Sequence, residues 1–371
     1  MNGKKRVSDV LSLREPDRTP VCLSPWKSTI KKWTSEGFLQ PGEDIVKHFD
    51  LDIRFHDFIN TKGNLEAGEK ILEQTCDTQV ILNENGATIK RFTDREAGEQ
   101  YIDYAVKTRK DWENLIKPYL LNIDQRRIPF EAYESKFKTS LEDHVFLFWR
   151  GPAPFELMRS LCGHETLLMA MAMDPDWVKD MVITYAEFTV KHLEILFAES
   201  GLPDGIFFFE DMGLKEKPFF SPEMYDKIMK PGHKILFDFA HTASVSKKVT
   251  VHSCGYVEPL LPGLIEAGMD CLQGLEVKAG MNLNKIFKQY GDKIALFGGL
   301  DARILMSNDF DKIKAAAIEH IFPVLKQKGA YILHSDHSEP PQVEYQTAVY
   351  IVNDLRKACS QQLDNNLKEE R

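Results

Sequence analysis

Eight short apolar segments alternate with helical patterns along this chain of 371 residues. They are centred near residues 21, 53, 146, 207, 250, 272, 296 and 332. Nearly continuous apolar strands that alternate with helices are typical of a parallel sheet covered on both faces. Eight such units predict an α/β fold, a (β/α)8 TIM barrel, formed as one domain by residues 1–360. An open, doubly wound sheet is the alternative, but no glycine-rich dinucleotide motif follows a strand.

Residues 70–105 do not follow this alternation of apolar strands and helices. Two strand-like segments, 78–82 and 87–92, flank the pair Asn85-Gly86, and such a pair is one of the strongest signals of a tight β-hairpin. We therefore expect a hairpin near residues 76–93 within an insertion over the main fold. The polar residues 361–371 are expected to form a C-terminal tail.

Composition narrows the class of protein. The formal net charge of −9 argues against nucleic-acid binding, which requires a basic surface. The six cysteines contain no CxxC pair, the N-terminus lacks the apolar segment of a secretory signal, and no apolar run approaches the length of a membrane span. These features predict a cytoplasmic protein with free thiols and no membrane segment. A homodimer is expected only because two-fold oligomers are the commonest.

The ends of the expected strands carry polar residues. In a (β/α)8 barrel the active site lies at the carboxyl ends of the strands, so side chains at these ends should surround one site. The residues in question are Ser24, Trp26, His56, Asp57, Trp149, Arg150, Glu210, Asp211, His252, Cys254, Glu276, Asp301, His334, Asp336 and His337. Among them we expect the substrate to be bound by His56, Trp149, Arg150, Asp211 and Glu276.

His252 and Cys254 end the strand that begins at Val249. Residues two apart in a strand point to the same face, with Cα atoms about 6 to 7 Å apart. That spacing suits two corners of a zinc tetrahedron. Taken alone, a His-x-Cys pair is more readily a core thiol beside a hydrogen-bonded histidine, because it supplies only two of the three or four ligands that zinc needs. Its position at the expected rim favours the metal site.

A third metal ligand must come from elsewhere in the chain. His337 is the first choice, and Asp336, Glu210 and His334 are the other candidates. Glu210 is interpreted as a displaceable ligand or a general acid, with a salt-bridged rim carboxylate as the alternative. Asp336 is a second candidate for catalysis, although it and Glu276 could equally orient or cap neighbouring groups.

Several of these segments together resemble the uroporphyrinogen decarboxylase superfamily, and within it the zinc-dependent corrinoid and coenzyme M methyltransferase branch. The resemblance covers about residues 140–357 and rests on Val251–Gly255, Leu260–Asp270, Phe297–Asp301, Glu210-Asp211 before Ser221-Pro222-Glu223, and Gly329–Pro341. It implies zinc on His252 and Cys254 and a corrinoid carried on a separate partner protein.

Two departures from the family pattern bear on the reaction. The decarboxylases are similar to one another in an Arg-Gln-Ala-Gly-Arg segment that grips substrate carboxylates, whereas this chain has Val21–Ser28 there, so porphyrinogen decarboxylation is not expected. The methyltransferases usually take a third ligand from a cysteine on the last strand, where this chain offers Asp336 and His337. Harder ligands of this kind fit an oxygen substrate better than a thiol.

The resemblance therefore implies a methyltransferase that moves a methyl group between a small methyl ether, alcohol or thiol and the corrinoid, as in O-demethylation. Glu210 or another rim acid would supply the proton that a leaving alkoxide needs. The alternative is a metal-independent decarboxylase or lyase of a small carboxylic acid, with Arg150 or Arg303 binding the carboxylate. A barrel that only binds a ligand or a corrinoid partner is the non-enzymatic alternative.

Overall fold

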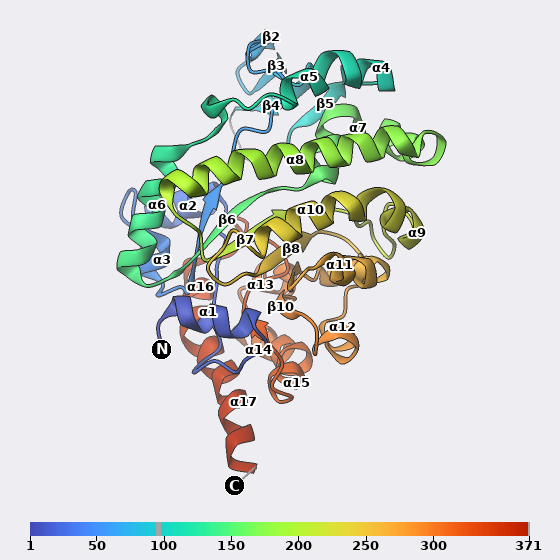
Figure 1. The fold of residues 1–371 in the computed structure, drawn as a ribbon. Coiled ribbons are helices and arrows are strands. Elements are labelled where there is room, and N and C mark those ends of the chain that lie inside the picture. The colour runs from blue at the N-terminus through green and yellow to red at the C-terminus, as the bar shows by residue number, and fades with distance from the viewer. Residues whose placement is uncertain (94–97, 370–371) are drawn as a thin grey trace.

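Seven parallel strands form one curled sheet in the computed structural model, which describes residues 1–93 and 98–369 (Figure 1). Neighbouring strands in the sheet follow the order of the sequence. They are β1 (Ile53–Asp57), β6 (Phe146–Pro152), β7 (Gly205–Phe209), β8 (Val249–Ser253), β9 (Cys271–Gly274), β10 (Ala295–Gly298) and β11 (Tyr331–Ile332). This arrangement is TIM-like, as the alternating apolar segments predict.

The expected strand near residue 21 is reduced to a single parallel bridge between Val21 and Leu333. The Cys22 amide donates to the Leu333 carbonyl over 3.0 Å, and the Asp52 amide donates to the Val21 carbonyl over 3.1 Å. Val21 is thus hydrogen-bonded toward both ends of the seven-stranded sheet. Proline cannot donate to a strand ladder, and Pro20 and Pro25 flank this segment, so a longer strand does not form. The prediction of an eighth regular strand is wrong in this respect.

Helices alternate with the strands and cover the outside of the sheet (Figure 1). The N-cap Asp174 accepts a hydrogen bond from the Trp177 amide, and Pro175 occupies the first position of α8 (Pro175–Ser200), where proline is well tolerated. Gly163, with φ 74°, interrupts α7. The helices are α1 (Gly3–Leu11), α2 (Lys27–Ser35), α3 (Ile45–His48), α4 (Arg109–Asp111), α5 (Lys117–Leu120), α6 (Phe130–Asp143), α7 (Pro154–Met173), α8 (Pro175–Ser200), α9 (Pro222–Met224), α10 (Lys230–Ala240), α11 (Leu261–Ala267), α12 (Leu283–Tyr290), α13 (Ala302–Leu305), α14 (Phe310–His320), α15 (Phe322–Leu325), α16 (Tyr345–Tyr350) and α17 (Arg356–Glu369).

The C-terminal residues differ from expectation, because α17 continues to Glu369 through most of the segment expected to be a tail. Residues 370–371 lie outside the described part of the chain. None of the described helices has the length and apolar character that crossing a membrane requires.

A second, antiparallel sheet of four strands confirms the hairpin predicted near residues 76–93. Its strands are β2 (Lys70–Gln74), β3 (Thr78–Leu82), β4 (Thr88–Phe92) and β5 (Gln100–Asp103). Gly86 takes φ 71° in the turn between β3 and β4, a conformation that favours glycine. Ile81, Ala87 and Ile89 form a small core of their own against Tyr101 and Tyr104. The insertion is therefore larger than a hairpin.

The main sheet separates two apolar clusters. Phe148, Phe207 and Phe297 belong to the cluster on its concave side. Their immediate neighbours Trp149 and Phe208 belong to the larger cluster between the strands and the helices. Because successive side chains of a strand point to opposite faces, this division decides which rim residues can reach the interior.

Candidate metal centre

Asp211, His252 and Cys254 bring one ligand atom each to within 4.8 Å of one another. His252 Nε2 lies 3.2 Å from Cys254 Sγ and 3.4 Å from Asp211 Oδ1. Two of these residues are the predicted zinc pair. The third, Asp211, was expected to bind substrate.

Strand pairing explains why Asp211 reaches this pair. Phe209 at the end of β7 lies in register with His252 of β8, and the Glu210 amide donates to the His252 carbonyl over 2.8 Å. Asp211 then emerges beside Cys254, whose amide donates to Asp211 Oδ1 over 2.8 Å. The aspartate is thereby fixed by the backbone of the residue whose thiol it faces.

Two glycines allow the loops after β7 and β8 to touch. Gly255 has φ 79°, and a Cβ atom built on it would lie 2.2 Å from the carbonyl carbon of Gly213. The Tyr256 amide donates to the Leu214 carbonyl over 2.7 Å, and the Gly255 amide donates to Glu276 Oε2 over 2.6 Å. The backbone around Cys254 is therefore held from both sides.

The His252 ring is oriented by the neighbouring strand. Gln273 lies opposite His252 in the β8–β9 register, and its Oε1 accepts a hydrogen bond from His252 Nδ1. The Gln273 amide nitrogen in turn lies 3.5 Å from His334 Nδ1. Fixing a proton on Nδ1 leaves Nε2 as the ligand atom, which is the usual arrangement around a metal-bound histidine.

The three residues of the cluster interact electrostatically. Burial lowers the pKa of His252, but the Cys254 thiolate and Asp211 outweigh burial and raise that pKa well above its ordinary value. Burial raises the pKa values of Asp211 and Cys254, but the hydrogen bonds and charge of His252 hold both pKa values below their ordinary values. The thiol and the carboxyl are thus biased toward the anionic forms that bind metals.

His337 also contacts the Cys254 thiol. Its side chain is hydrogen-bonded to Cys254, and this bond raises the pKa of His337. His337 lies beside Cys254 as the sequence leads us to expect, although it falls outside the three-residue cluster of Asp211, His252 and Cys254.

The cluster fits zinc. Zinc bonds of 2.0 to 2.3 Å imply ligand atoms about 3.3 to 3.7 Å apart along the edges of a tetrahedron. The separations from His252 Nε2 to Cys254 Sγ and Asp211 Oδ1, 3.2 and 3.4 Å, are close to this range. One nitrogen, one sulfur and one oxygen ligand form a set that zinc accepts.

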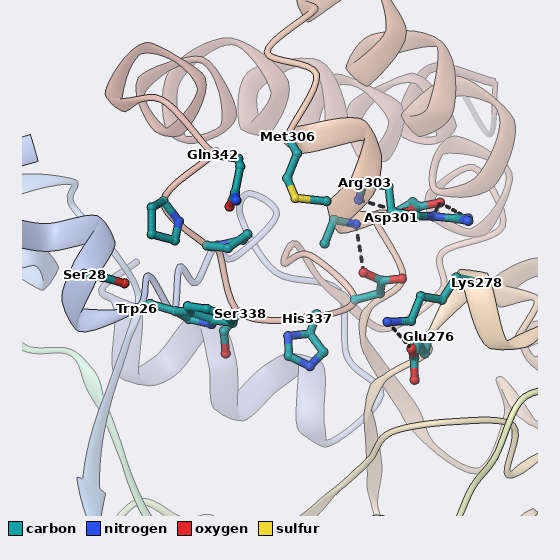
Figure 2. Close-up of a pocket in the computed structure, with 14 residues that line it drawn as sticks. Trp26, Ser28, Glu276, Lys278, Asp301, Arg303, Met306, His337, Ser338 and Gln342 are labelled. Atoms are coloured by element: carbon teal, nitrogen blue, oxygen red, sulfur yellow. Dashed lines mark hydrogen bonds and ion pairs between the residues drawn. The ribbon is translucent and has the colours of Figure 1, made fainter. Parts of the chain in front are cut away.

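Two cavities meet at His337 and Ser338. The inner one, about 100 Å³, is lined by His252, Gln273 and His334 together with Phe207 and Phe209. The outer one, about 640 Å³, has apolar walls that include Met306, Pro340 and Pro341. Figure 2 shows His337 and Ser338 between Trp26 on one side and the ion pair of Lys278 and Glu276 on the other.

A further cavity of about 400 Å³ reaches Cys254 from the side of Gly213. The cluster is thus accessible to small molecules.

Two of the expected substrate-binding residues lie at these cavities. Arg150 lines the inner cavity, where its guanidinium lies 4.5 Å from the centre of the Phe55 ring and is paired with Asp57. Glu276 lines the outer cavity and the one beside Cys254.

His56 and Trp149 point the other way. The two residues are paired in register between β1 and β6. His56 makes an edge contact with Tyr133 of α6, and Trp149 makes one with Phe197 of α8. Both rings are buried between the sheet and the helices, so this placement corrects the expectation that they face the substrate.

The two expected catalytic carboxylates have structural partners. Glu210 is fully buried and accepts hydrogen bonds from the amides of Phe155 and Glu156, in the first turn of α7, and from His233. Asp336 accepts hydrogen bonds from the amides of Val277 and Ala302 over 2.9 and 2.8 Å. Burial raises the pKa of Asp336 to about 6. Glu210 is thus held away from the cavities by its structural partners, whereas Asp336 lines the outer cavity.

Sequence reasoning missed that Asp211 joins the cluster and that Gln273 orients the His252 ring. The signal for Gln273 is a polar residue inside the apolar segment 271–275, one strand beyond His252. No comparable signal separates Asp211 from Glu210, because the choice depends on how the loops after β7 and β8 pack.

Comparisons with known proteins agree with this fold. A methyltransferase from Methanosarcina mazei is similar over 96% of this chain and 99% of its own, with 18% sequence identity and a TM-score of 0.69. A Xaa-Pro dipeptidase with bound methionine in the active site, 12% identical, covers 66% of this chain and 68% of its own, and its TM-score of 0.29 is too low to carry an argument. No curated protein sequence matches the chain.

The family model described as uroporphyrinogen decarboxylase (URO-D) matches residues 75–358, a span that contains every member of the metal cluster. The chain therefore belongs to the uroporphyrinogen decarboxylase family.

Proposed function

We propose that this protein is a zinc-dependent methyltransferase, which moves a methyl group between a small methylated substrate and a corrinoid carried on a partner protein. The observation that carries the proposal is the cluster of Asp211, His252 and Cys254, with the His252 ring oriented by Gln273. The URO-D family membership and the fold shared with the methyltransferase from Methanosarcina mazei support it.

His252, Cys254 and Asp211 would hold the zinc ion, and His337 is the nearest further ligand. A zinc ion bound here would act as a Lewis acid, which stabilises a thiolate or polarises the oxygen of a methyl ether or alcohol. The oxygen and nitrogen ligands favour an oxygen substrate over a thiol.

The chain's own residues would position the substrate. Met306, Pro340 and Pro341 offer an apolar wall to its carbon skeleton, and Arg150 and the Lys278–Glu276 pair offer polar contacts near the cluster. The cavity of about 640 Å³ is large enough for a small molecule. We also propose that residues 1–360 form one domain, with the segment at Val21 in the place of the eighth barrel strand, since it is hydrogen-bonded toward both β1 and β11.

The test combines metal content with turnover. Wild-type protein purified without added metal is expected to contain about one zinc per chain, and Cys254→Ser is expected to lose it. Cys76→Ser, at an exposed cysteine away from the cluster, is the matched control and should keep the metal. The zinc-loaded protein should then methylate a free reduced corrinoid from a methyl ether or alcohol. Equal zinc content in wild type and Cys254→Ser would exclude this site.

A metal-independent decarboxylase or lyase is the second candidate, because Arg150 lines the same inner cavity as His252 and could bind a carboxylate there. Carbon dioxide release from a small acid by metal-free protein, retained in Cys254→Ser and lost in Arg150→Met, would favour that reaction.

A further inference from the structure

A cavity of about 340 Å³ lies between residues 23–27 and β1, beside the metal cluster rather than on it. Its lining contains four cationic side chains and one carboxylate, namely Lys27, Arg54, Lys136, Arg150 and Asp44. Such an excess of positive charge is unexpected in a protein whose formal net charge is −9.

Asp44, the one carboxylate in this lining, already has hydrogen-bond partners. Asp44 Oδ2 accepts from Arg54 Nη2 over 2.5 Å, and Asp44 Oδ1 accepts from the Val46 amide at the start of α3. The Asp143 carboxylate, outside the cavity, shares the same Arg54 nitrogen at 2.9 Å. Asp44 and Asp143 are therefore both engaged by Arg54, and neither pairs with Lys27 or Lys136.

Arg54 itself has unmet hydrogen-bonding capacity. Its side chain is 2% exposed, and its Nε and Nη1 atoms have no hydrogen-bond partner. A buried cationic donor without a partner is costly, and a small shift of the Arg54 side chain would let an acceptor supplied by a ligand reach these atoms, which are not exposed to the cavity in this conformation.

The other cations stand on separate elements around the same space. Lys27 and Lys136 make no ion pair with any residue that the structure describes. Lys27 begins α2, whose N-cap residue Trp26 provides no side-chain hydrogen bond, so the positive end of that helix also faces this region. Arg150 lies over the Phe55 ring, and Asp57 is its one ion-pair partner among the described residues.

We infer that this cavity binds the anionic group, a carboxylate or a phosphate, of a small organic ligand. Guanidinium and ammonium groups recognise both anions. The cavity shares Ser24, Phe55, Arg150 and Ser338 with the inner cavity that contains His252, so the remainder of the ligand extends toward the metal cluster. The inference does not depend on zinc or on methyl transfer, because Asp211, His252 and Cys254 do not line this cavity.

The test is calorimetric titration of the full chain with inorganic phosphate and with succinate, at constant ionic strength. Wild type is expected to bind at least one of these anions saturably at one site per chain. Lys136→Glu should weaken that binding about tenfold or more, since it replaces a charged hydrogen-bond donor by a repelling group. Lys138→Glu, an exposed residue of the same helix that does not line the cavity, makes the same charge change and should bind as wild type does.

Cys254→Ser is expected to keep the anion binding, so that a failure of the zinc site and a failure of this inference give different results. Tighter binding of phosphate or of succinate would assign the ligand to one of the two chemical classes. The inference is overturned if neither anion binds saturably, or if Lys136→Glu and Lys138→Glu weaken binding equally.

Discussion

His252 Nε2 lies 3.2 Å from the Sγ atom of Cys254, two residues further along the chain. The separation follows from the alternation of side chains at the end of β8, which turns both residues to one face. The third residue of the cluster, Asp211, comes from the loop after the neighbouring strand β7 and is fixed by the Cys254 amide. The local sequence thus brings two residues of the cluster together, and strand pairing adds the third.

The identity of the third zinc ligand can be tested by substitution. Asp211→Asn removes an anionic oxygen next to His252 Nε2. It should weaken zinc binding by about 10- to 100-fold or more, because losing a residue that merely orients a ligand already costs this much. His337→Gln should have the smaller effect, since His337 contacts the thiol but lies outside the three-residue cluster. Competition with a chromophoric chelator measures both affinities, and the reverse order would make His337 the ligand.

Gln273 should act on the metal through His252. Gln273→Leu removes the acceptor for His252 Nδ1 and is expected to weaken zinc binding about 10- to 100-fold. Gln273→Glu keeps an oxygen acceptor at the same position and should restore most of the affinity. If the leucine variant binds zinc like wild type, the ring is oriented by other contacts.

Asp336 should make the stability of the fold depend on pH. Burial raises its pKa from 3.8 to about 6, so the folded protein binds this proton more tightly than the unfolded chain does. The resulting stabilisation is fully present below the unfolded pKa and is lost as the pH rises through about 6. Between pH 4.5 and 7.5 the free energy of unfolding should fall by about 2 kcal/mol in wild type relative to Asp336→Asn. Urea denaturation at several pH values measures this difference, and parallel curves for the two proteins would contradict it.

Gly255 should be required for both stability and metal binding. Gly255→Ala places a Cβ atom 2.2 Å from the Gly213 carbonyl carbon at φ 79°, so the loops after β7 and β8 must separate. We expect a loss of more than about 1 kcal/mol in the free energy of unfolding, together with weaker zinc binding. Gly280→Ala is the matched control, because its φ is 102° but the nearest atom lies 3.6 Å away. Equal effects in the two variants would trace the loss to backbone strain rather than to the loop contact.

The sequence predicts the main sheet well because its strands are apolar on both faces and bounded by loops. Because both faces are apolar, the sequence does not indicate which side chains point to the inside of the sheet and which point to the helices. Trp149 and Arg150 are adjacent in the middle of β6, and of these two only Arg150 lines the inner cavity. Alternation of polar and apolar residues normally reveals the inward face, but β6 is apolar on both sides up to this point.

The site was predictable where its residues share one strand and unpredictable where it depends on packing between loops. His252 and Cys254 follow from their spacing. The burial of Glu210 against the first turn of α7 and the approach of Asp211 to Cys254 are tertiary contacts that no local pattern records.

The two-residue alternation of β8 has a consequence for how such a protein can diverge. Insertion or deletion of a single residue within Val249–Ser253 would turn His252 toward the helices and bring Val251 or Ser253 to the cavity in its place. Changes of length beyond the strand ends, in loops such as the segment from Lys278 to Met281, would leave this alternation intact. Descendants of this chain could therefore acquire new substrates by remodelling loops while the strand lengths stay fixed.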